Sequence, residues 1–155
     1  MNHDFNIGNI ESLKEENRND QRLGDWWIYL LNNNVIVAGF DGELDDKGTQ
    51  ILRERVGEGD WIFAYASEHG YLGVGLAASP RTYNLLKESP PDYLSNNLHQ
   101  RDIRWLVYVD SLDNAIPASE IGIYHPVPTE QTIGNDKSEK IVRAFWQNSK
   151  TVIRF

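Results

Sequence analysis

The sequence contains no cysteine among its 155 residues. Disulfides, a thiolate nucleophile and a cysteine-based zinc site are therefore excluded, and the composition fits a reducing compartment such as the cytoplasm. No apolar run approaches the roughly 20 residues that span a bilayer. The polar, acidic start of the chain lacks the basic and apolar regions of a signal peptide. We therefore expect a soluble, cytoplasmic protein with no membrane partner.

The chain is also poor in positive charge, with 15 Lys and Arg against 23 Asp and Glu and a formal net charge of −8. This balance counts against a broad basic face for nucleic acid. Basic residues nevertheless gather near the C-terminal end, where Lys137, Lys140 and Arg143 are candidates for contacts to a nucleic-acid backbone. The alternative interpretation is the solvated face of a helix.

Signatures of catalysis are missing as well. There is no P-loop, no GxSxG turn and no HExxH pair. The four histidines are scattered without ligand spacing, and the acidic run at 41–46 is typical of a solvent-exposed loop. We therefore expect no catalytic residues, no metal, no cofactor and no enzymatic activity.

The length suits one domain with one core. Residues 1–24 are rich in Asn, Asp and Glu, which predicts a flexible acidic segment, followed by an ordered domain over 25–155. Apolar and aromatic runs predict strands at 26–31, 35–40, 61–67, 71–78, 103–109 and 151–155, and helices at 47–56 and 138–148. The tight turn at 68–70 makes 61–67 and 71–78 a hairpin. This pattern predicts an α+β fold, a small mixed β-barrel with flanking short helices.

Aromatic residues are the most suggestive feature, since the chain has five Trp, seven Tyr and five Phe. Many lie in three of the predicted strands. Part of this set must form the core, because aromatic side chains dominate core energetics. The rest could form a cage that stacks on a planar base. Gly73 and Gly75 share one strand face, which indicates that another group approaches closely there.

Several motifs occur in an order that resembles EVE domains of the PUA-like superfamily. They are WWIY at 26–29, AGF at 38–40, GDWIFAY at 59–65, GYLGVG at 70–75, RWLV at 104–107 and QTI at 131–133. The resemblance covers about 25–146. It implies a small β-barrel related to YTH and ASCH domains, and a binder of modified bases in DNA or RNA. It also implies a separate nuclease or NTPase effector in a modification-dependent restriction or defence system.

The resemblance further implies an aromatic pocket that captures an extruded base. The residues that match it by position are Trp27, Tyr29, Gly39, Phe40, Asp41, Tyr65, Ser67 and Tyr71. Asp41 is the candidate for reading a base edge, since a carboxylate accepts from exocyclic amines. Modified DNA is the expected partner, with RNA as the alternative. The net charge of −8 leaves open a different class of function, a sensor or interaction module that takes a small ligand or peptide in the same pocket.

Overall fold

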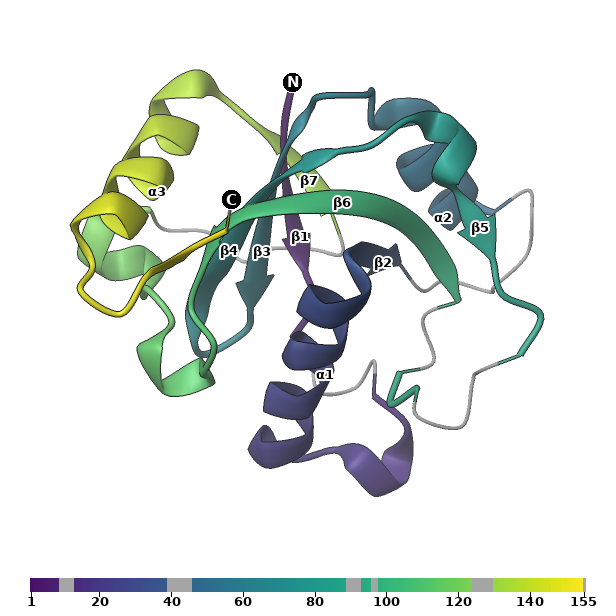
Figure 1. The fold of residues 1–155 in the computed structure, drawn as a ribbon, viewed down its shortest axis with the longest axis horizontal. Coiled ribbons are helices and arrows are strands. Elements are labelled where there is room, and N and C mark those ends of the chain that lie inside the picture. Colours follow the sequence, from purple (N-terminus) through teal and green to yellow (C-terminus); the bar gives the residue numbers. More distant parts are fainter. Residues whose placement is uncertain (9–12, 39–45, 89–92, 96–97, 124–129, 155) are drawn as a thin grey trace.

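The computed structural model describes residues 1–8, 13–38, 46–88, 93–95, 98–123 and 130–154. Over these residues one mixed sheet is surrounded by helices (Figure 1). The strands are β1 (Asn2–Asn6), β2 (Val35–Ala38), β3 (Trp61–Ala66), β4 (Gly70–Ala77), β5 (Asn84–Leu85), β6 (His99–Tyr108), β7 (Glu130–Ile133) and β8 (Val152–Ile153). The helices are α1 (Asp20–Asn33), α2 (Lys47–Thr49), which continues as the π-helical segment η3 (Gln50–Arg55), and α3 (Asn135–Gln147). This content confirms the α+β class.

The sheet is strongly curled because its longest strand, β6, arches across the molecule (Figure 1). The strand order is β2-β6-β4-β3-β1-β7, and β5 and β8 also pair with β6. Only β1 and β3 run parallel among these pairs; the rest are antiparallel. Since β2 and β7 stand at opposite ends of this order, the described strands form a half-barrel.

Residues 26–31 lie in helix α1, so the prediction of a strand there was wrong. Aromatic and branched residues favour strands, but the buried residues of this segment are spaced three or four apart, as on one face of a helix. These buried residues are Leu23, Trp26, Trp27, Leu30 and Leu31. Caps fix both ends of this helix. The Asn19 side chain accepts from the Arg22 amide, and Asn34 closes the C-terminus in the left-handed conformation.

The N-terminal residues also differ from the expectation of a flexible segment over 1–24. Strand β1 lies between β3 and β7, and Asn2 to Phe5 are buried. Helix α1 begins at Asp20 and so crosses the expected boundary at residue 25. The segment has little apolar area to bury, but its polar side chains find partners on distant elements, which composition alone does not reveal.

His3 illustrates this pairing. Its Nδ1 lies 2.8 Å from Glu130 Oε2 and its Nε2 lies 2.9 Å from Asp60 Oδ2, while Arg55 donates to Glu130 Oε1 at 2.7 Å. Burial alone would raise the pKa of Glu130, but its interactions with His3 and Arg55 outweigh burial and hold that pKa below the ordinary value. The buried end of β1 is therefore fixed by an ionic network.

The core is centred on the contact between α1 and the sheet. Trp27 packs edge-to-face on Trp105 with ring centroids 5.1 Å apart, and its indole N–H donates to the Val109 carbonyl at 2.7 Å. Gly73 lies under this indole, since a Cβ there would stand 2.9 Å from Trp27 Cη2. The expected close approach at Gly73 is therefore made by a core tryptophan.

The hairpin of β3 and β4 confirms the clearest prediction from the sequence. The strands pair antiparallel from Trp61 opposite Leu76 to Ala66 opposite Gly70, and Glu68 and Gly70 take positive φ in the turn. The C-terminal helix and strand are also present, as α3 and β8. Among the described residues, no helix is both long and apolar enough to cross a membrane.

Candidate nucleic-acid interface

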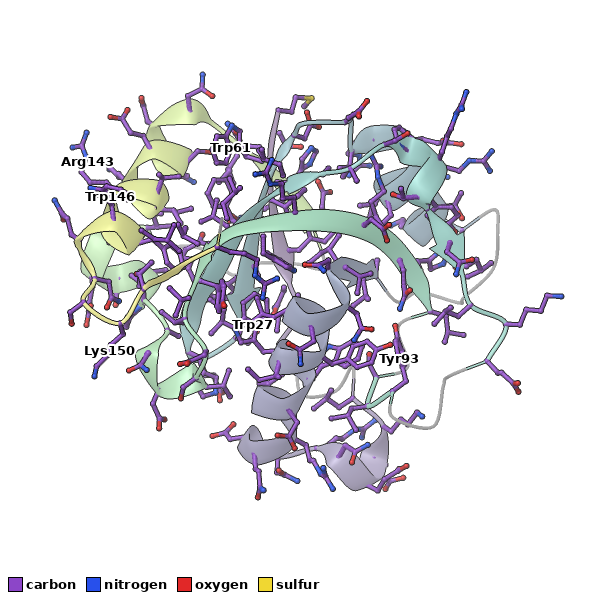
Figure 2. The ribbon with its side chains drawn as sticks, viewed as in Figure 1. Trp27, Trp61, Tyr93, Arg143, Trp146 and Lys150 are labelled. Carbon is purple, nitrogen blue, oxygen red and sulfur yellow. The ribbon has the colours of Figure 1, made fainter. Side chains whose placement is uncertain are left out.

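The structure separates the residues predicted to form one base pocket. Trp27 and Tyr71 are fully buried, Tyr29 lies on α1, and Tyr65 and Ser67 lie at the end of β3. Gly39, Phe40 and Asp41, the remaining predicted members, lie outside the described residues. Trp27 is part of the core beneath the sheet, as Figure 2 shows for its labelled side chain. Two separate aromatic groups therefore remain as candidates for the pocket.

The first group surrounds Tyr29. Its ring stacks on Trp26, with centroids 5.1 Å apart and planes 13° from parallel. Tyr93 meets both rings edge-on, at 4.7 Å from Trp26 and 5.5 Å from Tyr29. Burial raises the pKa of Tyr93 well above its ordinary value. Tyr93 was missed from sequence because it lies in a polar connection, far along the chain from α1.

An open pocket of about 650 Å³ lies against this group, with Tyr29 and Tyr93 in its lining. Its charges are balanced, because Lys14 and Arg22 face Glu16 and Asp25. Arg22 and Asp25 form an exposed ion pair at 3.2 Å. The pocket therefore presents aromatic faces and polar edges with little net charge.

Trp26 lies behind the pocket and is completely buried. Within the described part of the chain its indole N–H has no hydrogen-bond acceptor. A buried donor left unsatisfied costs about 1–3 kcal/mol.

The second group lies at the end of β3. Tyr65 is half-buried and packs edge-on against Tyr71 at 5.1 Å, and Tyr71 donates its hydroxyl to Asp4 Oδ2 at 2.9 Å. Ser67 accepts from the Asn6 side chain at 2.8 Å. Burial, followed by the Asp4 charge, raises the pKa of both tyrosines.

The hollow beside Tyr65 is smaller, about 260 Å³, and Glu68 is part of its lining. A carboxylate at the rim repels phosphates, and the hollow has less than half the volume of the pocket beside Tyr29. The group around Tyr29 is therefore the better candidate for a base.

The predicted backbone contacts Lys137, Lys140 and Arg143 are exposed on α3. Glu139 on the same helix pairs with Arg143 at 2.7 Å, which offsets part of the positive charge. Figure 2 labels Arg143 on the outer side of α3 and Tyr93 across the molecule from it. These cations are therefore not brought together with the aromatic pocket.

Comparison with known proteins identifies a fold but no family. No family profile and no curated protein matches the sequence. Among solved structures, the chain is similar to the YTH domain of Mmi1, solved in complex with RNA, with a TM-score of 0.55 and 12% identity over 92% of this chain and 76% of that one. The fold is therefore YTH-like. Over the described residues, no group of three or more His, Asp or Glu side chains is placed to hold a metal ion.

Proposed function

We propose that this protein is a nucleic-acid-binding module that takes an extruded modified base into the pocket beside Tyr29 and Tyr93. The observation that carries the proposal is this pocket itself, where two tyrosines backed by Trp26 line one open hollow of about 650 Å³. The likeness of the fold to a YTH domain solved with RNA supports a nucleic-acid partner. The resemblance to EVE domains supports a modified base.

The chemistry of the pocket suits a base better than a phosphate. Extruding a base costs a few kcal/mol, and stacking on an aromatic ring returns about 1–3 kcal/mol per base. Asn17, Asn32 and Asp25 in the lining offer amide and carboxylate groups for hydrogen bonds to base edges. The balanced charge matches a neutral base, since a phosphate would need net positive charge.

The proposed role is binding rather than catalysis, with any nuclease or NTPase activity supplied by a separate effector protein. The fold supports this role because the similar YTH domain is known from its complex with RNA.

Fluorescence-anisotropy titration tests the proposal directly. Labelled single-stranded DNA and RNA would be compared in plain, methylated and hydroxymethylated forms at about 0.1 M salt, where the Debye length is about 10 Å. We expect at least one modified strand to bind more tightly than its plain counterpart. If no oligonucleotide binds at high micromolar protein, the proposal is wrong, and a small ligand or peptide becomes the better candidate.

Paired tyrosine variants assign the pocket. We expect Tyr29→Ala to weaken binding of the preferred strand by about 5- to 150-fold, the equivalent of about 1–3 kcal/mol of stacking, and Tyr29→Phe to retain it. The matched control is Tyr65→Ala, since Tyr65 is also half-buried but lies at the second group. Loss of binding in Tyr65→Ala with retention in Tyr29→Ala would move the pocket to the end of β3.

A further inference from the structure

A second hollow is formed by η3 and by the segment that follows β4. It has a volume of about 670 Å³, and its lining includes Arg53, Arg81, Tyr83, Leu86 and Lys87. Arg53 comes from η3, whereas the others come from the chain around β5. We call this hollow the cationic groove.

The charge of the cationic groove is of one sign. Arg53, Arg81 and Lys87 are exposed, and among the described residues no carboxylate contributes to the lining. Within the described part of the chain, none of these three side chains forms an ion pair. Glu54 and Glu88 are their neighbours in sequence but do not line the groove.

Other hollows among the described residues carry acidic side chains. Glu16 and Asp25 line the pocket beside Tyr29, Asp20 and Asp110 line a third hollow, and Glu68 lines the hollow beside Tyr65. On a protein of net charge −8, a groove lined by cations without acids is a local exception. Its electrostatic complement is a polyanion.

The floor of the groove is fixed by hydrogen bonds. The Tyr83 hydroxyl lies 2.7 Å from His99 Nδ1 and 3.0 Å from Thr49 Oγ1. Asp46 Oδ1 lies 2.8 Å from the other ring nitrogen of His99. A ligand in the groove therefore meets an aromatic ring held by hydrogen bonds together with exposed cationic side chains, the combination that binds single strands elsewhere.

We infer that the cationic groove binds the phosphodiester backbone of the single strand whose modified base enters the pocket beside Tyr29. This inference rests on the function proposed above. Lys87 is six residues from Tyr93, so the two positions are at most about 22 Å apart. Tyr93 and β5 also share one half of the molecule, opposite α3 (Figures 1 and 2). A single strand of a few nucleotides is long enough to span this separation.

The test is the salt dependence of oligonucleotide binding. Arg53→Gln/Lys87→Gln removes one cation from each wall of the groove. A matched control, Arg104→Gln/Lys150→Gln, removes one exposed arginine and one exposed lysine at other surfaces and causes the same change in net charge. Anisotropy titrations with the preferred strand, as DNA and as RNA, would be repeated over a range of salt concentrations.

We expect the slope of log K against log salt, which is negative, to become about 1.4 less steep in the groove variant, since each lost contact to a single strand removes about 0.7 from its magnitude. This change corresponds to roughly 25-fold weaker binding at 0.1 M salt relative to 1 M. The control variant should keep the slope of the unaltered protein. The loss should be equal for DNA and RNA, because phosphates are common to both.

Three results would overturn the inference in distinguishable ways. An unchanged slope in the groove variant, or an equal loss in the control, would reject the groove while leaving the base pocket in place. Tighter binding of a poly-glutamate peptide than of the oligonucleotide would assign the groove to an acidic protein partner. Failure of the unaltered protein to bind any oligonucleotide would reject the base pocket and the groove together.

Discussion

Arg101 is a buried cation whose removal should destabilise the protein strongly. It is 0% exposed and lies in β6. Its Nη1 donates to the carbonyls of Leu52 at 2.6 Å and Val56 at 2.7 Å, and its Nη2 donates to the Ala78 carbonyl at 2.7 Å. Arg101 therefore ties η3, which carries Arg53, to the chain that leads from β4 to the other wall of the cationic groove.

The variant Arg101→Met keeps most of the apolar stem and removes every donor. Two buried carbonyls and one partly buried carbonyl would then lose this donor, at a cost of about 1–3 kcal/mol each. Burial lowers the pKa of Arg101, so part of that cost is offset when the desolvated charge is removed. We expect a net loss of about 3–5 kcal/mol in the free energy of unfolding.

Urea denaturation followed by tryptophan fluorescence measures this loss. With a slope of about 2 kcal/mol per molar urea, the midpoint should fall by roughly 2 M. The urea midpoint of Arg101→Lys should lie between those of Arg101→Met and the unaltered protein, because lysine keeps the charge but cannot reach all three carbonyls at once. A loss below about 1 kcal/mol for Arg101→Met, or full stability of Arg101→Lys, would refute the assigned role.

Three further predictions concern the core and the ionic network. Gly73→Ala should lower the free energy of unfolding by about 1–3 kcal/mol, because the added methyl group would press against Trp27. A melting temperature equal to that of the unaltered protein would contradict this packing. Tyr71→Phe should cost about 1.5–3 kcal/mol, because buried Asp4 loses a donor; an unchanged urea midpoint would argue against that bond. The pKa of Glu130 is lowered in the folded state. Its contribution to the free energy of unfolding is therefore complete at a pH above the ordinary glutamate pKa of about 4.3, and it is lost as the pH falls through the folded pKa. Glu130→Gln should show less of this acid dependence, and an identical pH profile would exclude Glu130 as its source.

Local signals were sufficient for the hairpin and insufficient for the first helix. The turn between β3 and β4 combines a tight connection with alternating apolar strands, and both signals lie within neighbouring residues. In α1 the two kinds of signal conflict, since Trp26 and Trp27 favour a strand by residue type while their spacing from Leu23 and Leu30 is helical. The helical spacing and the Asn19 cap could have decided the matter from sequence alone.

The candidate site was only partly predictable. Tyr29 lies in the lining of a hollow, and its role in binding a base stays a prediction. Its neighbour Tyr93 lies 64 positions further along the chain, and a single sequence does not show which distant residues touch. The cationic groove was missed for the same reason, because Arg53 and Lys87 stand far apart in sequence and only the packing of η3 beside β5 brings them to one hollow.

The net charge of −8 is a weaker argument against nucleic-acid binding than composition suggests. Some acidic groups face inward, since Asp4 and Glu130 are buried and already bonded to protein partners. Repulsion from the remaining surface acids is screened beyond about 10 Å at 0.1 M salt, whereas a phosphate inside the cationic groove would meet Arg53 and Lys87 within a few ångströms. At physiological ionic strength the local sign of the groove therefore outweighs the sign of the whole molecule, and the overall charge disfavours indiscriminate binding of polyanions rather than binding at this one place.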